Sequence, residues 1–182
     1  MPRAAILTFD ECYASSVGGF ADILQIANSH LRRQQGAAAA QFEWHFVSSS
    51  GNPIVASNGL QLQTQKLEPL ERYDLVFIPS LHYGGQRQFD QILDRLAATS
   101  NWLVAQWRAG AWIAANCTGT FILAQTGLLD GRTVTTTWWL ERQFRARYPK
   151  VDLQIRSVLT ESDRLVCAGA SASYLLQAIR II

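Results

Sequence analysis

Cys117 is the residue of this chain whose type and surroundings could most readily do chemistry. It lies within AWIAANCTGTFILAQTG, residues 111–127, where an apolar run meets Asn-Cys-Thr-Gly and apolar residues then recur at helical spacing. The pattern predicts a strand, a sharp turn and a helix, with Cys117 at the turn. Next to the N–H groups and the positive dipole of a helix start, a thiol is expected to have a lowered pKa. Such a cysteine acts as a nucleophile or faces a bound anion, the alternative being a buried and inert thiol.

Two further loops are expected to face Cys117. Residues 4–9 and 73–79 are short apolar runs of the kind that forms buried parallel strands, and loops follow both runs. Ligands of parallel sheets bind beyond the carboxyl ends of the strands. Residues 10–16, 81–85 and 117–120 should therefore form one crevice.

The rest of the chain alternates helical and strand patterns. Helices are predicted over residues 17–33, 88–98, 101–109, 138–148 and 171–182. Two stretches indicate strands: residues 42–47 and the β-branched residues 133–137. Asn58-Gly59 indicates a hairpin within residues 54–65. A second hairpin is predicted around ESDR, with residues 151–159 and 165–167 as its two arms. The last helix is expected to bury one apolar face: Tyr174, Leu175, Ala178, Ile179 and Ile182. These elements predict an α/β fold, a doubly wound, mostly parallel sheet with helices on both faces.

Length and composition limit the class of protein. The 182 residues suit one domain, and 48% hydrophobic with 16% charged residues excludes a disordered tail. A net charge of +2 is too small to indicate a nucleic-acid surface on this chain. Three cysteines without a C-x-x-C pair are typical of reduced thiols in a cytoplasm, and no metal site or cofactor is indicated. No run is long enough to span a bilayer, so we expect no membrane association and a cytoplasmic location.

Four segments resemble a known family. NCTGTFILAQTGLLDGRTVTTTWW, residues 116–139, resembles the cysteine-elbow segment of the DJ-1/PfpI superfamily, the class I glutamine amidotransferase-like proteins. More narrowly, it is similar to the N-terminal domain of AraC-family transcriptional regulators, and VGGFADILQIAN, DLVFIPSLHYGG and CAGASASYLLQAI agree. The resemblance implies a flavodoxin-like domain over residues 1–182. It also implies a helix-turn-helix DNA-binding domain after residue 182, outside this chain; the uncapped last helix agrees with that expectation.

Two departures from the family pattern concern catalysis. The histidine of the family's T-T-H-W motif falls on Thr137, and an acidic position early in the first helix region falls on Ser16. A threonine cannot take a proton from a thiol at neutral pH, so the general base of a Cys-His pair is missing. His82, in the loop after residue 79, is expected to line the crevice rather than to act as a base. The expected ligand-binding residues are Ser16, Leu81, His82, Tyr83, Cys117, Thr118, Thr137 and Trp138.

The expected function is a non-catalytic, small-molecule-sensing and dimerisation domain of a transcriptional regulator, which reaches DNA only through the additional domain. Six tryptophans, with Trp138 and Trp139 next to the site, favour an amine or quaternary ammonium effector, because aromatic faces attract cations. The homodimer surface is expected around residues 20–31 or 102–112. A cysteine-dependent hydrolase of the DJ-1/PfpI type and a thiol redox sensor using Cys117 remain the alternatives.

Overall fold

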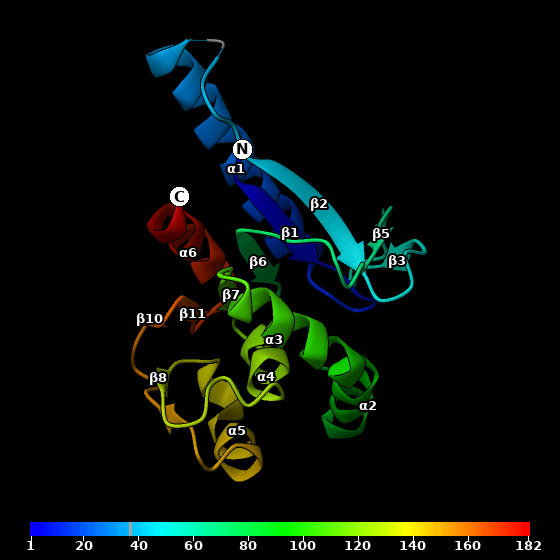
Figure 1. The fold of residues 1–182 in the computed structure, drawn as a ribbon. Helices are drawn as coiled ribbons and strands as arrows, with labels where there is room; N and C mark the ends of the chain where they lie inside the picture. Colours follow the sequence, from blue (N-terminus) through cyan, green and yellow to red (C-terminus); the bar gives the residue numbers. More distant parts are fainter. Residues whose placement is uncertain (37) are drawn as a thin grey trace.

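A seven-stranded sheet forms the centre of the protein, whose computed structural model describes residues 1–36 and 38–182 (Figure 1). The strands are β1 (Arg3–Leu7), β2 (Glu43–Ser48), β5 (Gln65–Lys66), β6 (Leu75–Ile78), β7 (Trp112–Asn116), β10 (Leu159–Ser162) and β11 (Leu165–Ala168). Their spatial order is β10-β11-β7-β6-β1-β2-β5, and every neighbouring pair is parallel except β10 with β11. The expected doubly wound, mostly parallel sheet is confirmed.

Helices cover both faces of this sheet (Figure 1). They are α1 (Ala14–Gln35), α2 (Gln86–Leu96), α3 (Ser100–Arg108), α4 (Gly119–Ala124), α5 (Glu141–Arg147) and α6 (Tyr174–Ile181), with 3-10 turns η1 (Ala97–Thr99), η2 (Trp138–Leu140) and η3 (Ser171–Ser173). The β1-to-β2 and β6-to-β7 connections run in opposite directions along the sheet. Because such crossovers are right-handed, α1 lies on one face, where α6 packs against it, and α2 and α3 lie on the other. Among the described residues, no helix is both long and apolar enough to cross a membrane.

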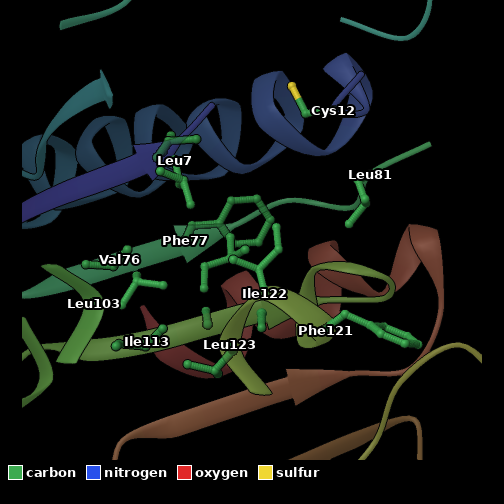
Figure 2. Close-up of a cluster of buried hydrophobic side chains, with 14 of the residues drawn as sticks. Leu7, Cys12, Val76, Phe77, Leu81, Leu103, Ile113, Phe121, Ile122 and Leu123 are labelled. Atoms are coloured by element: carbon green, nitrogen blue, oxygen red, sulfur yellow. The ribbon is translucent and has the colours of Figure 1, made fainter. Parts of the chain in front are cut away.

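The core fills the space between the sheet and its helices. Figure 2 shows side chains of β1, β6 and β7 meeting those of α3 and α4, among them Leu7, Phe77, Leu103 and Ile122. On α1, Phe20 stacks on Phe77 with ring centroids 4.0 Å apart. All four residues of β6 are buried, which explains its continuous apolar sequence. Each such side chain contributes about 2 kcal/mol through burial, so the sheet holds the loops at its carboxyl ends firmly.

The two predicted hairpins had different outcomes. The hairpin around Asn58-Gly59 is confirmed, since β3 (Ile54–Val55) pairs antiparallel with β4 (Gln61–Leu62). The prediction that residues 151–159 form an arm of the second hairpin is wrong. β9 (Asp152–Leu153) instead pairs parallel with β8 (Thr133–Val134), and β11 pairs with β10. The reason is the turn: Asp163 and Arg164 both have positive φ, 48° and 64°, as a tight two-residue hairpin requires.

The last helix is present, but its orientation differs from the prediction. The turn η3 precedes it, and Gln177 and Ala178 are its buried residues. Much of the expected inward face is exposed instead, including Leu175 at 43% and Ile179 at 67%. The inward face instead carries the buried amide of Gln177, whose Nε2 has two backbone acceptors while its Oε1 has no partner among the described residues. Residues 37–40 are four consecutive alanines, and the first of them lies outside the described residues.

Gln177 connects α6 to two strands. Its side-chain Nε2 donates hydrogen bonds to the carbonyl oxygens of Ala115 in β7 (3.1 Å) and Val166 in β11 (2.8 Å). Nearby, the Nδ2 of Asn116 donates to the carbonyl of Ala170 at 3.0 Å, just before η3. The C-terminal segment is therefore fixed to the end of the strand that leads into Cys117.

Candidate functional site: a closed cysteine elbow

Cys117 occupies the predicted turn between β7 and α4. Its φ is 53°, a left-handed conformation that costs a non-glycine residue about 1–2 kcal/mol and is typical of functional turns. Gly119 opens the helix where no side chain fits, since a Cβ there would lie 2.5 Å from the carbonyl oxygen of Pro79 and 2.8 Å from that of Ile78. The backbone of Cys117 donates to the carbonyl of Ala168 at 2.7 Å. The elbow is thus fixed by close contact with the ends of β6 and β11.

The three loops expected to form one crevice do meet. The hydroxyl of Thr118 accepts a hydrogen bond from the N–H of Leu81 (2.8 Å) and donates to the carbonyl of the same residue (2.9 Å). Leu81 also forms an antiparallel bridge with Cys12, and the N–H of Tyr13 donates to the carbonyl of Ser80 at 2.9 Å. The prediction that the loop after β6 faces the elbow is confirmed. These bonds leave the loops closed upon one another.

The pKa of the Cys117 thiol is raised, so the expected lowering is wrong. The side chain is only 4% exposed, and burial in these surroundings disfavours the thiolate. The neighbouring Thr137 side chain and the Thr118 backbone favour the thiolate and so oppose this effect, without overcoming it. Helix α4 has six residues, and its dipole does not outweigh the loss of hydration. The thiol is therefore protonated at neutral pH.

The residues at the positions of the missing catalytic partners make structural contacts. The Thr137 hydroxyl lies against the thiol, where the relatives' histidine is expected. Ser16 is fully buried in the first turn of α1, and its hydroxyl donates to the carbonyl of Tyr13 at 2.9 Å. Within residues 1–36 and 38–182, no hydrogen bond joins Cys117 to a histidine or a carboxylate. A group that takes the proton of the thiol is not in place.

Tyr13 is a site residue that the sequence analysis missed. Its hydroxyl lies 3.5 Å from Nδ1 of His82, and burial together with the nearby Cys117 raises its pKa. His82 is thus turned towards Tyr13 rather than bonded to the thiol. Tyr13 lies in the loop that was placed at the crevice, but nothing in the sequence distinguished it from a packing aromatic residue.

The expected ligand-binding residues fall into two environments. Five are buried at the elbow, His82 and Tyr83 are partly exposed, and Trp138 is 72% exposed; the five are Ser16, Leu81, Cys117, Thr118 and Thr137. Trp138 and Trp139 border a surface hollow of about 560 Å³ together with Glu141, Arg142 and Arg145. We call this hollow the Trp138 surface. The ring of Tyr83 packs against Trp139 with centroids 5.2 Å apart, so Tyr83 supports this surface.

The described residues contain no group of three or more His, Cys, Asp or Glu side chains that could hold an ion.

Comparison with known sequences agrees with this geometry. The model of the DJ-1/PfpI family matches residues 3–176. The chain therefore belongs to the DJ-1/PfpI family.

Several proteins similar to this chain are regulators. The chain is 31% identical over 159 residues to the HTH-type transcriptional regulator CdhR of Pseudomonas aeruginosa, which covers 87% of this chain and 44% of CdhR. It is 28% identical over 167 residues to the HTH-type transcriptional regulator GbdR of Pseudomonas aeruginosa, covering 91% of this chain and 42% of GbdR. The crystal structure of an AraC family transcriptional regulator from Pseudomonas putida superposes with a TM-score of 0.72 at 16% identity, over 100% of this chain and 90% of that one, and shows that the fold is shared. The chain spans less than half the length of the two curated relatives.

Proposed function

We propose that this chain is the effector-sensing domain of an AraC-type transcriptional regulator and that it carries out no catalysis of its own. The observation that carries the proposal is the closed elbow: a 4% exposed thiol of raised pKa that faces the hydroxyl of Thr137. A cysteine hydrolase needs a base at that point and space for substrate. A thiol redox sensor needs an accessible thiolate, so the same observation counts against both alternatives. The regulators CdhR and GbdR support the sensing role.

The effector is proposed to bind at the Trp138 surface, which adjoins the elbow through Thr137. Trp138 offers a widely exposed indole face, and cation–π contacts with such faces contribute about 0.5–1 kcal/mol at exposed sites and more when desolvated. Glu141 is paired with Arg145 at 2.9 Å, and Arg142 adds a second positive charge. The attraction for a cation therefore comes from the indoles rather than from the net charge. An amine or quaternary ammonium compound is therefore proposed to bind through the indole faces, away from the charge of Arg142.

Self-association is proposed to use the helical face formed by α1 and α6. Leu175, Leu176 and Ile179 of α6 and Ile26 of α1 are 43–67% exposed, and exposed apolar side chains on packed helices are typical of interfaces. A twofold dimer is the commonest closed assembly and would match paired DNA half-sites reached through an additional domain. Sedimentation at tens of micromolar should give twice the chain mass. The double variant L176E/I179E should be monomeric, and a wild-type monomer across that range would refute the assignment.

Catalysis is tested by turnover. Purified wild-type protein and the Cys117→Ala variant should hydrolyse p-nitrophenyl acetate and small amides at the same background rate, because no base is positioned to generate the thiolate. A second variant, Thr137→His, restores the side chain of the family motif and serves as a positive comparison. A wild-type rate clearly above that of Cys117→Ala would overturn the non-catalytic assignment.

Effector binding is tested with matched probes. Calorimetry with choline and with its neutral isostere 3,3-dimethylbutan-1-ol separates cation recognition from apolar contact. Choline should bind measurably and the neutral alcohol about tenfold more weakly. Trp138→Leu should lose the preference, Trp138→Phe should keep part of it, and Leu70→Ala, which removes a side chain 87% exposed elsewhere, should leave it unchanged. Equal binding of both probes would contradict the proposed effector class.

A further inference from the structure

A small polar hollow lies beyond the carboxyl ends of β1 and β2, where parallel sheets bind ligands. Its volume is about 110 Å³, and its polar lining includes Asp10 after β1, Ser49 and Ser50 after β2, and Arg95 in the last turn of α2. Buried apolar side chains, among them Ile92, also contribute. We call it the Arg95 hollow. The elbow follows β7, β6 separates β7 from β1, and the lining shares no residue with the Trp138 surface. The hollow is therefore separate from the site in the proposed function.

Arg95 is the cation of this hollow. Its side chain is exposed and has no ion pair or hydrogen bond within residues 1–36 and 38–182. The two carboxylates of the same helix, Asp90 and Asp94, are paired with Arg147 of α5 at 2.7 and 3.6 Å. A guanidinium group presents planar N–H donors that match an oxyanion. An unpaired guanidinium in a hollow therefore favours a bound anion.

The segment after β2 adds neutral hydrogen-bond donors. Its turn is held by the hydroxyl of Ser48, which accepts from the N–H of Gly51 at 3.0 Å. The hydroxyl oxygen of Ser50 accepts from the N–H of Asn52 at 3.1 Å, which leaves the hydroxyl proton of Ser50 free to donate. In the part of the chain that the structure describes, the hydroxyl of Ser49 has no partner. Hydroxyl donors beside a guanidinium are a combination that binds oxyanions.

Asp10 determines which anions this lining accepts. Its Oδ1 accepts from the N–H of Val55 at 2.8 Å, which fixes the carboxylate against β3. The other oxygen, Oδ2, has no partner on the described residues. A carboxylate repels an anion that has no proton, but it accepts a hydrogen bond from an anion that keeps an acidic proton. Phosphate keeps such a proton at neutral pH and sulfate does not, so Asp10 favours phosphate.

We propose that the Arg95 hollow binds inorganic phosphate, whose oxygens accept hydrogen bonds from Arg95 and Ser50 and whose acidic proton is donated to Asp10. The volume corresponds to about three or four water molecules at about 30 Å³ each, which suits one tetrahedral oxyanion and is too small for a nucleotide. A phosphomonoester offers a similar group, but it loses its last acidic proton with a pKa of about 6. At pH 7.5 inorganic phosphate is therefore the species that satisfies Asp10.

The test compares sodium phosphate with sodium sulfate at pH 7.5, low temperature and constant ionic strength. Nitrogen-15 correlation spectra of the chain follow the backbone N–H signals of Ser49 and Ser50. Phosphate should shift these signals and bind with a dissociation constant of about 1 mM, as its few atoms allow. Sulfate is similar in size but has no proton for Asp10, so it should bind about tenfold more weakly. Methyl phosphate should resemble sulfate, and binding as tight as that of phosphate would overturn the assignment to the inorganic ion.

Asp10→Asn tests the origin of this selectivity. The amide oxygen can still accept from the N–H of Val55, while the new NH₂ group can donate to any oxyanion. Sulfate should then bind as tightly as phosphate. A preference for phosphate that survives in Asp10→Asn would contradict the role of the carboxylate.

Arg95→Gln tests the cation and should weaken phosphate binding about tenfold. Its matched control is Arg87→Gln, which removes the same charge from an exposed position of α2 outside the lining and should bind like the wild type. Both positions are exposed, so neither change should affect folding. Three results would each overturn the proposal: equal losses in the two variants, equal binding of phosphate and sulfate by the wild type, and unchanged Ser49 and Ser50 signals at tens of millimolar phosphate.

Discussion

Thr137 and Trp138 are neighbours in the chain but belong to two contrasting regions. Thr137 is 2% exposed and lies next to the thiol of Cys117, within a junction where three loops are joined by hydrogen bonds. Trp138 is 72% exposed and borders an open hollow. In the first region the hydroxyls of Thr118 and Thr136 hold backbone groups in place. The comparison indicates that the elbow acts as a structural junction, whereas the proposed recognition of a small molecule takes place at the Trp138 surface.

The largest effect on stability is expected from Gly119→Ala, which tests whether the elbow is rigidly fixed. The added Cβ would lie within 2.8 Å of two backbone carbonyl oxygens, which cannot move without shifting β6. We expect a loss of about 3 kcal/mol in the free energy of unfolding. The matched control is Gly18→Ala in α1, where nothing lies within 4 Å and alanine should stabilise the helix by about 0.5–1 kcal/mol. Urea unfolding measures both, and equal effects would mean that the elbow tolerates displacement.

Alkylation by iodoacetamide measures how closed the elbow is. Only the thiolate reacts with iodoacetamide. The side chain of Cys117 is buried, and the pKa of its thiol is raised above the ordinary value of 9.0. At pH 8 its modification in the native protein should be about a hundredfold slower than in urea. The native rate should continue to rise above pH 9, where an unperturbed thiol levels off. Peptide mapping distinguishes Cys117 from Cys12 and Cys167.

The control for this measurement is Leu70→Cys, which introduces a thiol at an 87% exposed position and should react as fast as an unfolded cysteine. Rapid modification of Cys117 at pH 7 would show an accessible thiolate and would return the redox and hydrolase alternatives to consideration.

Thr118→Val tests the hydrogen bonds between the loops. Valine keeps the shape but leaves the N–H and carbonyl of Leu81 without their partner. We expect a loss of about 2 kcal/mol in unfolding free energy. Thr118→Ser retains the hydroxyl and removes one methyl group, so about 0.8 kcal/mol should be lost. If serine and valine destabilise equally, packing rather than hydrogen bonding holds these loops together.

The smallest effect on the free energy of unfolding is expected at the Trp138 surface. Trp138→Ala removes the largest exposed side chain of this region and should change the free energy of unfolding by less than about 0.5 kcal/mol. The same variant should reduce the fraction of tryptophan fluorescence that acrylamide quenches. A large destabilisation would show that Trp138 is part of the core and would remove the contrast between the two regions.

Much of the fold could be predicted because it is encoded locally. The apolar runs that became β1, β6 and β7, and the Asn-Cys-Thr-Gly turn after β7, needed only short-range patterns. The raised pKa of Cys117 could not be predicted from its neighbours in sequence. It results from burial by loops that lie more than thirty residues away, such as the one containing Leu81.

The errors at the C-terminal end have a similar cause. Helix α6 has more apolar residues than one helix face can hold, so its sequence does not determine which face is buried. In the structure, the hydrogen bonds that Gln177 donates to β7 and β11 set the orientation. The arm of the second hairpin was misplaced because alternation in residues 151–159 does not say which strand will be the partner. Trp138 was expected at the crevice because it follows Thr137; the chain enters η2 at this point, and the side chain is 72% exposed.

The single amide of Gln177 gives α6 a mechanical role. Because it donates to Ala115, two residues before Cys117, and to Val166 at once, a shift of the end of β7 relative to β11 strains a bond on the helix. The outer side of the same helix carries the exposed side chains of Leu175 and Ile179. The amide therefore makes the placement of α6 depend on the spacing between the ends of β7 and β11.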